Sequence, residues 1–230
     1  PGHPRLLHIW ADDRFALWTG CLVKYWLRIP TNTDIYVVLS QWWGRFAAKQ
    51  LDEVDIDVHV SNRGPDRARN EIIEQFLASK GMRSQADKLW LLDRDVVPPS
   101  HKPTIYSFLT ADYPVVSGVT DIFSGTESYK QVYKLTENGT YITQSPDKWP
   151  KSDLFVTDAV GAGCLCLSRK LLEWMPKPWC EFDGEYGEDL NFCRKTGHKI
   201  VVYQKMACRH YKTVDLSSIS NAGDAQTPEH

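Results

Sequence analysis

The sequence lacks any uninterrupted apolar run of the length that a membrane-spanning helix requires, about 20 residues. Its longest apolar stretches are residues 15–23 and 159–168. It also lacks a positively charged amino-terminal region followed by an apolar segment, so we expect no secretory signal. A large excess of charge of one sign is absent too, since the formal net charge is −2. We therefore expect a soluble, cytoplasmic protein with no membrane span, and the overall charge favours neither nucleic acid nor an anionic membrane as a partner.

Paired C-x-x-C motifs, from which zinc ribbons are built, are missing as well. We interpret most of the cysteines as buried free thiols of a reduced, intracellular protein. The alternative is a zinc site formed by Cys180, Cys193, Cys208 and His210, which have suitable ligand types but no known zinc-finger spacing. The six cysteines are at positions 21, 164, 166, 180, 193 and 208.

The composition is that of a folded globular domain. Hydrophobic residues make up 42% of the chain and charged residues 24%, which excludes a disordered, collagen-like or coiled-coil protein. A length of 230 residues is compatible with one domain that buries a substantial core. We assign residues 1–212 to this domain and predict that residues 213–230, rich in Ser, Asn and Ala, form a mostly disordered tail.

The first hundred residues alternate between strand and helix patterns. The continuously apolar residues 89–92, Leu-Trp-Leu-Leu, are typical of a central parallel strand that is covered on both faces. This order predicts an α/β protein with an open, mostly parallel, Rossmann-like sheet flanked by helices. The expected strands are 6–10, 34–39, 55–60 and 89–92, and the expected helices are 14–27, 42–51 and 66–77.

The pattern changes after Pro98 and Pro99. Residues 121–153 are polar and rich in turn signals, and two hairpin strands within them predict a small antiparallel element. Further strands are expected at 113–119, 130–135, 140–143, 160–167 and 199–203, and helices at 169–174 and 188–195.

Two acids follow the buried strand at 89–92. Asp93 and Asp95 are two residues apart, so in extended chain their side chains point the same way. Ligands of open α/β sheets bind beyond the carboxyl ends of the strands. There one carboxylate could hold Mg²⁺ or Mn²⁺ on the phosphates of a nucleotide while the other holds a ribose. The alternative is a strand-ending turn with solvated acids, which the adjoining apolar strand and prolines disfavour.

A basic segment opens the helix expected at 66–77. It contains Arg63, Arg67, Arg69 and Asn70. Arginines at a helix N-terminus favour the binding of an anion such as a diphosphate. The alternative is a solvated basic turn capped by Asp66.

An acidic loop leads into the helix expected at 188–195. A carboxylate at its start, Asp189 or Glu188, could take a proton from a reacting hydroxyl as a general base, although acids also simply stabilise helix N-termini. The rings of Trp179 and Tyr186 flank this loop and could stack on a sugar or belong to the core. His210, after the last expected strand, is either structural or part of an aspartate–histidine site for a metal such as manganese.

In combination, these motifs resemble nucleotide-sugar glycosyltransferases of the GT-A fold, in the broad group that contains family 2 enzymes and β-1,4-galactosyltransferases. The similarity extends over roughly residues 5–212 and depends on the order of the motifs. The motifs are Arg-Asn at 69–70, Leu-Trp-Leu-Leu-Asp-Arg-Asp-Val-Val-Pro-Pro at 89–99, Gly-Ala-Gly-Cys-Leu-Cys-Leu-Ser-Arg at 161–169, Gly-Glu-Asp at 187–189 and Cys-Arg-His at 208–210.

The resemblance implies a GT-A catalytic domain over residues 1–212, with a nucleotide-binding half at about 1–100 and an acceptor or catalytic half at 101–212. It implies that Asp95 and His210, together with Asp93, bind Mn²⁺ or Mg²⁺ on the donor diphosphate, and that Asp189 is the general base with Glu188 as its rival. The implied donor-site residues are Asp93, Arg69, Arg67, Asn70, Arg63, Asp13 and Lys212, and the implied acceptor-site residues are Trp179, Tyr186, Gly163 and Glu185.

We therefore expect a metal-dependent, inverting glycosyltransferase that uses a UDP-sugar. Its acceptor stays open between a glycan, a small molecule and a hydroxymethylated pyrimidine in DNA, the acceptor of phage enzymes of this family type. One alternative is a nucleotidyltransferase, which would need a glycine-rich loop where this sequence has Trp-Ala-Asp-Asp at 10–13. Another is a non-catalytic nucleotide-sugar-binding module, which should have lost Asp95, Asp189 or His210.

Overall fold

A computed structural model of the chain describes residues 25–31, 37–42, 44, 46, 54–60, 63–79, 86–123 and 127–211. The strand expected at 6–10, the candidates Asp13 and Lys212, and the tail expected at 213–230 lie outside these described residues. Within them, no helix combines the length and apolar character needed to cross a membrane.

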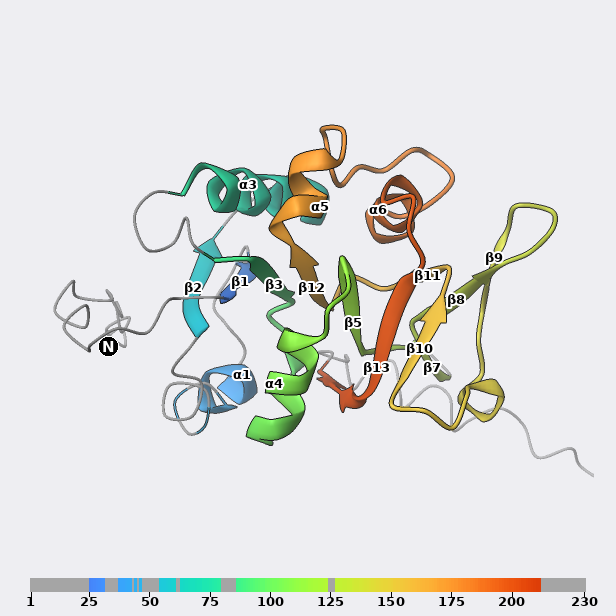
Figure 1. The fold of residues 1–230 in the computed structure, drawn as a ribbon, viewed down its shortest axis with the longest axis horizontal. Coiled ribbons are helices and arrows are strands. Elements are labelled where there is room, and N and C mark those ends of the chain that lie inside the picture. Colours follow the sequence, from blue (N-terminus) through green and yellow to red (C-terminus); the bar gives the residue numbers. More distant parts are fainter. Residues whose placement is uncertain are drawn as a thin grey trace, which may run out of the picture.

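A seven-stranded mixed sheet forms the centre of the molecule (Figure 1). Its strands, in spatial order, are β10 (Leu154–Thr157), β13 (Ile200–Ala207), β5 (Val115–Val119), β12 (Cys164–Ser168), β3 (Lys88–Leu92), β1 (Tyr25–Thr31) and β2 (Val54–Val60). All of these strands run in one direction except β12 and β10, which run in the opposite direction. The predicted open, mostly parallel α/β sheet is therefore confirmed, with β3 near its centre.

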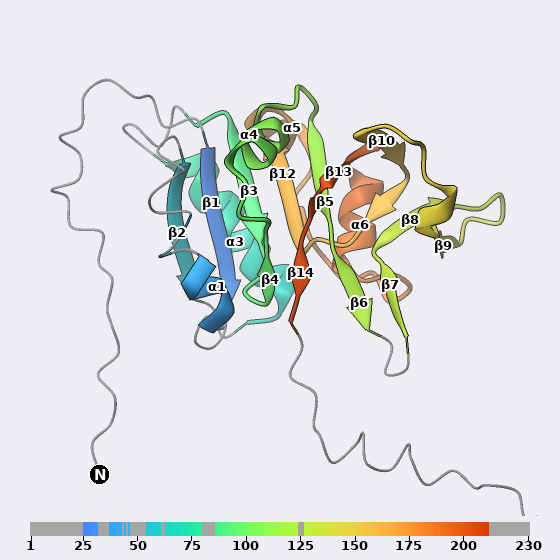
Figure 2. The same cartoon turned by 90° about the horizontal axis from the view of Figure 1, so that it is seen from below.

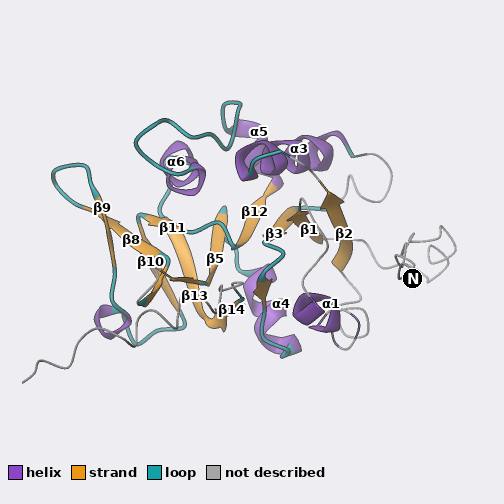
Figure 3. Ribbon diagram, turned by 180° about the vertical axis from the view of Figure 1, so that it is seen from behind, coloured by secondary structure: helices purple, strands orange, loops and turns teal. Residues whose placement is uncertain are grey.

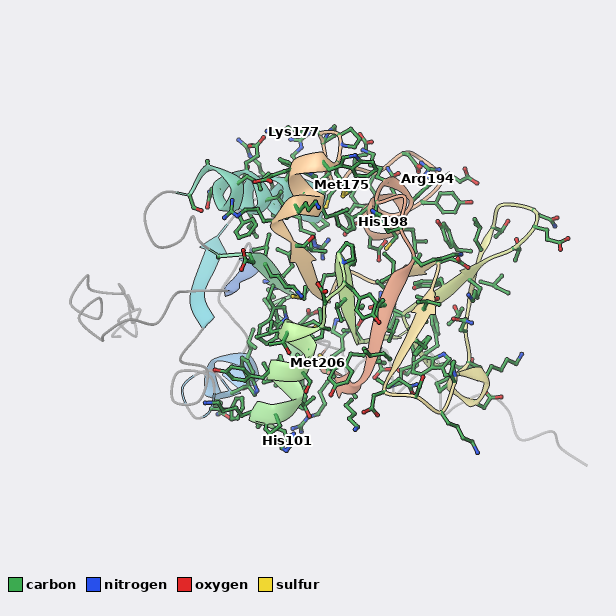
Figure 4. All side chains as sticks on the ribbon, viewed as in Figure 1. His101, Met175, Lys177, Arg194, His198 and Met206 are labelled. Carbon is green, nitrogen blue, oxygen red and sulfur yellow. The ribbon has the colours of Figure 1, made fainter. Side chains whose placement is uncertain are left out.

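Helices cover both faces of this sheet (Figures 1 and 3). Each face has its own hydrophobic core cluster, the first containing Met175 and the second Met206 (Figure 4). The helices predicted at 66–77, 169–174 and 188–195 are all present on the first face. That face carries α3 (Pro65–Ala78), α5 (Arg169–Trp174) and α6 (Glu188–Lys195), and the second carries α1 (Val37–Trp42) and α4 (Lys102–Thr110).

Two predictions for the amino-terminal part were wrong. Residues 25–27, expected to end a helix, belong to strand β1, which pairs with β2 on one side and β3 on the other. Residues 37–39, expected to be a strand, belong to α1, which buries Leu39 and Trp42 at helical spacing. The ring of Trp42 packs edge-on against that of Trp90 on β3, with 6.3 Å between the ring centroids. Tertiary pairing and packing thus override local propensities, which are weak for short apolar runs.

Three smaller sheets accompany the central sheet. The hairpin of β8 and β9, joined by β11, confirms the expected antiparallel element. Figure 2 shows the other two ladders beside each other at the carboxyl ends of the parallel strands. The elements are β8 (Val132–Leu135), β9 (Tyr141–Thr143) and β11 (Ala159–Val160); β4 (Val96–Val97) with β14 (Arg209–His210); β6 (Asp121–Phe123) with β7 (Ser128–Lys130); and the 3-10 turn η4 (Pro146–Lys148).

The five cysteines within the described ranges are buried free thiols, as the sequence suggested. Burial raises the pKa of Cys166, Cys180 and Cys193 to about 12, so these thiols are neutral near pH 7. The residues of the alternative zinc site, all of them described, do not gather into a group that could hold a metal ion. Nothing in the structure therefore favours the zinc site.

Gly118 lies at a point of close packing within the central sheet. A Cβ atom there would lie 2.9 Å from Cys164 Sγ and 2.9 Å from the carbonyl oxygen of Met206. A backbone carbonyl within a ladder cannot swing aside as a flexible side chain can. Strand β5 therefore needs glycine at this position to fit between β12 and β13.

We predict that Gly118→Ala destabilises the protein by about 1–3 kcal/mol, the usual cost of overpacking a core. Urea denaturation followed by circular dichroism measures this change. Gly44→Ala is the matched control, because a Cβ at Gly44 would meet no atom within 4 Å, and its effect should stay within about 0.5 kcal/mol. Equal stability of the two variants would contradict this account of β5.

Candidate active site

Asp95 and His210 form a pair at the carboxyl ends of the parallel strands. The β4–β14 ladder places His210 opposite Val96, and the backbone N–H of Tyr211 donates to the carbonyl of Asp95 at 2.7 Å. As a result, Nε2 of His210 lies 3.0 Å from Oδ2 of Asp95. The structure thus brings together two candidates that the sequence separates by 115 positions.

On the other edge of the His210 ring, Nδ1 donates a hydrogen bond to the backbone carbonyl of Asp121. Because a carbonyl oxygen can only accept, Nδ1 carries a proton. In the neutral ring Nε2 then has the lone pair that a cation would bind, and Nε2 donates to Oδ2 of Asp95 only when it is protonated as well. Histidines that ligate metals are commonly oriented by a carbonyl in this manner. The side chains of His210 and Asp95 are only 10% and 20% exposed, which limits their freedom to turn away.

The pair fits a hard or borderline divalent cation. A carboxylate oxygen and an imidazole nitrogen suit Mn²⁺ and are compatible with Mg²⁺. Among the residues that the structure describes, no three His, Cys, Asp or Glu side chains form a group that could hold one ion, so Asp93 does not join this pair as a third ligand. Mg²⁺ is usually bound by only one or two carboxylates, with substrate phosphates and water completing the shell. The residues therefore fit an ion that arrives with an anionic ligand.

Arg69 on α3 binds two acids from other elements. Its Nη2 donates to both carboxylate oxygens of Asp93, at 2.8 and 3.1 Å, and its Nη1 donates to Glu188 at the start of α6. The side chain is only 5% exposed, and its Nε has no hydrogen-bond partner. Burial by itself lowers the pKa of Arg69, but the charges of Asp93 and Glu188 outweigh burial, and the pKa is raised. Arg69 is therefore a buried, permanently charged link between the end of β3 and α6.

The neighbouring Asn70 strengthens the same link. Its side-chain amide donates to the carbonyl of Cys180 at 2.6 Å and accepts from the backbone N–H of Cys180 at 3.0 Å. Both polar ends of this amide thus hold the backbone of the segment that leads to α6. Adjacent residues of α3 consequently tie the loop and the helix that carry the candidate base.

Asp189 occupies the second position of α6, and its Oδ1 accepts a hydrogen bond from the backbone N–H of Leu190 at 2.8 Å. Burial raises the pKa of Asp189, and the adjacent charge of Glu188 raises it further. Burial, followed by the charge of Asp189, raises the pKa of Tyr133 on β8 to about 12. A carboxylate with a raised pKa accepts a proton more readily, as a general base must.

The other donor-site candidates lie around the start of α3. Arg67 is exposed in the first turn of the helix. Arg63 is paired with Glu71 at 2.8 Å on the surface. Arg67 is therefore an exposed cation in the first turn of this helix, where the helix dipole also favours an anion.

The acceptor-site candidates have different surroundings. Trp179 is 1% exposed and its indole N–H donates to the carbonyl of Leu172 at 2.8 Å, so its ring belongs to the core. Tyr186 donates its hydroxyl to the carbonyl of Gly139 at 2.8 Å. Glu185 is exposed on the acidic loop, whereas Gly163 is buried and its carbonyl accepts from the backbone N–H of Asp93 at 3.0 Å.

Two contributors to the site were not found from the sequence. Asp121 acts through its backbone carbonyl, which every residue type carries, so no sequence pattern could reveal it. Tyr133 comes near Asp189 through the fold, because β8 pairs with β11 and β11 is in contact with α6. Its aromatic side chain in a short hairpin strand carried no signal of this proximity.

Comparison with solved structures identifies the architecture. A197 from STIV aligns over 83% of this chain and 86% of its own, with a TM-score of 0.60 at 17% sequence identity. GalNAc-T7, solved with UDP, GalNAc and Mn²⁺, aligns over 84% of this chain and 45% of its own, with a TM-score of 0.55 at 13% identity. The sequence matches no protein-family model and no curated protein. At these identities the similarity shows the fold, and the predicted GT-A-like architecture is confirmed.

We predict that Arg69→Met lowers the free energy of unfolding by about 3 kcal/mol, because removing one member of a buried ionic group leaves its partners unpaired. Chemical denaturation measures the loss. Arg63→Met is the matched control, since it breaks an ion pair in which Arg63 is 59% exposed and should cost at most about 1 kcal/mol. Similar losses in the two variants would show that Arg69 does not hold the site together.

Proposed function

We propose that this chain is a glycosyltransferase that moves a sugar from a UDP-sugar to the hydroxyl of an acceptor, with Mn²⁺ or Mg²⁺ as cofactor. The observation that carries the proposal is the Arg69 bridge. It joins Asp93 of the Asp-Arg-Asp motif to Glu188, next to the candidate base Asp189. Asp95, two residues beyond Asp93, contacts His210.

The fold supports the same activity. The solved structure of GalNAc-T7, which shares this architecture, contains UDP, GalNAc and Mn²⁺. In open α/β sheets, nucleotides bind beyond the carboxyl ends of the strands, which is where Asp95 and His210 lie. The described residues favour neither the nucleotidyltransferase nor the non-catalytic module.

In this proposal Asp95 and His210 would hold the metal ion, and the carbonyl of Asp121 keeps the proton of the neutral His210 ring on Nδ1. When bound, the ion would supply positive charge that stabilises the departing diphosphate. The exposed Arg67 at the N-terminus of α3 contributes a further positive charge for the donor. Asp93 is oriented by Arg69 and faces the ribose.

Asp189 takes the proton of the acceptor hydroxyl. The hydroxyl oxygen then forms a bond to the anomeric carbon of the donor sugar, while the bond from that carbon to the diphosphate breaks and the diphosphate leaves with the electron pair. Direct displacement from the opposite side inverts the anomeric centre. Glu188 is less suited to the role of base, because its carboxylate is already bound by Arg69.

The proposed metal site leads to a prediction on donor binding. Calorimetry with UDP and MnCl₂ should show that UDP binds the wild type. The affinity for UDP should fall by about 10–100-fold in Asp95→Ala and in His210→Ala, because each variant removes one of the two protein ligands. His198→Ala is the control, since His198 is exposed on the α6 side of the molecule (Figure 4). Equal affinity for UDP with and without a chelator would refute the metal role.

The proposed base leads to a prediction on turnover. Asp189→Asn keeps the size of the side chain but cannot accept the proton, so the turnover number should fall by about 10²–10⁴-fold while UDP binding persists. Transfer is measured by release of UDP in the presence of acceptor. Near-normal turnover in Asp189→Asn, combined with loss of turnover in Glu188→Gln, would transfer the role to Glu188.

The pH dependence separates the two acids further. Since burial and Glu188 raise the pKa of Asp189, the acidic limb of the rate profile should lie above the pKa of an ordinary aspartate, about 3.9. Glu188→Gln removes the like charge but retains Arg69, whose charge lowers the pKa of Asp189, so the limb should move to lower pH. Asp153→Asn, at an exposed ion pair with Lys205, should leave the limb unchanged.

A further inference from the structure

A cavity of about 390 Å³ opens between the β6–β7 hairpin and the segment that follows β9. Its volume is near the lower end of the range for small-molecule sites, about 300–1,000 Å³. It is therefore large enough for a single sugar ring with its substituents. Its walls include Asp121, Tyr129 and Lys130 from the hairpin, and Thr143, Gln144 and Ser145 from the end of β9 onward.

The cavity adjoins the Asp95–His210 pair. Asp121, which contributes to its wall, is the residue whose carbonyl oxygen is hydrogen-bonded to His210. Figure 2 shows β6 and β14 close together at the same end of the sheet, and the two elements are in contact. A ligand in this cavity would consequently contact a residue that also contacts His210, one of the proposed metal ligands.

The lining has polar groups but no net charge. Asp121 and Lys130 form an ion pair at 2.7 Å, and their charges cancel. The other polar side chains of the lining are neutral. They are the hydroxyls of Ser128, Tyr129, Thr143 and Ser145 and the amide of Gln144, whose Oε1 accepts from Thr157 at 3.0 Å. Such groups favour a neutral ligand with several hydroxyls, because each can donate or accept without a charged partner.

Tyr129 adds an accessible aromatic surface. Its side chain is among the exposed large hydrophobic residues of the chain, at 37% exposure. An aromatic ring beside hydroxyl and amide groups suits a ligand that has one apolar face and a polar edge. A pyranose ring has both, since its axial C–H groups lie on a face and its hydroxyls lie around the rim.

We infer that this cavity is the acceptor site and that it binds a neutral pyranose, the terminal sugar of a glycan or glycoside; this inference rests on the proposed glycosyltransferase activity. A DNA acceptor would require basic groups for the phosphate backbone. Lys130, the only basic residue among the described residues that line the cavity, is already paired with Asp121. The hydroxyl that Asp189 deprotonates is accordingly a sugar hydroxyl.

The test blocks the cavity with one large side chain. Thr143 lines the cavity, whereas Ile142 is 52% exposed and, as the adjacent residue of a strand, points to the opposite face of β9. Thr143→Trp should therefore fill the cavity, and Ile142→Trp adds the same ring outside it. Saturation-transfer NMR uses the methyl glycosides of glucose, galactose, mannose and N-acetylglucosamine as probes, without nucleotide.

We expect at least one of these glycosides to bind the wild type and Ile142→Trp, and to lose its signal with Thr143→Trp. In transfer assays the Michaelis constant for that glycoside should rise at least about tenfold in Thr143→Trp, while UDP affinity is unchanged. Tyr129→Ala, which removes the ring without filling the cavity, should weaken the same glycoside.

The outcomes separate the two proposals. Three results would overturn the acceptor assignment. UDP binds but no glycoside binds, or Thr143→Trp binds glycosides as the wild type does. The third is that a hydroxymethylated DNA oligonucleotide is glycosylated equally by both variants. If instead a glycoside binds in the cavity but UDP with Mg²⁺ or Mn²⁺ does not bind, the saccharide site stands and the glycosyltransferase proposal fails.

Discussion

The ionic contact of Arg69 with Asp93 and Glu188 is the interaction on which the arrangement of the candidate site depends. It connects α3, the end of β3 and the start of α6, which have no backbone hydrogen bonds in common. A buried guanidinium can satisfy two carboxylates at once because its donors form a planar fork. The two half-buried acids in turn offset the cost of burying its charge. Asp189 owes its position, one residue beyond Glu188, to this contact.

The opposite side of the site is organised by backbone groups. His210 is aimed at Asp95 by the carbonyl of Asp121 and by the short β4–β14 ladder. The same Asp121 belongs to the hairpin whose side chains line the 390 Å³ cavity. The proposed metal site and the proposed acceptor site therefore share one structural support, so a shift of the β6–β7 hairpin would change both together.

The sequence predicted the elements most reliably where periodicity and termination signals agreed. The helix at 188–195 follows a glycine and begins with two acids, and its observed bounds are the predicted ones. The apolar strand at 89–92 was equally clear. In contrast, residues 25–27 and 37–39 were assigned to the wrong element type, because short apolar runs fit a helix and a strand alike and the choice depends on partners distant in sequence. Asp13 and Lys212 lie outside the described residues, so their roles stay predictions.

The sequence by itself determined the α/β class and the order of the motifs, because hydrophobic periodicity and glycine and proline signals are local properties. The order of the motifs also led, through the resemblance to GT-A glycosyltransferases, to the proposal that Asp95 and His210 are partners. Only the tertiary structure decided that Arg69 turns inward to two acids, that Trp179 belongs to the core, and that Nε2 of His210 faces Asp95. These facts depend on which side chains share a buried space. That is decided by packing between different elements of the fold, such as Arg69 of α3 with Glu188 of α6 and Asp95 with His210, rather than by any local pattern.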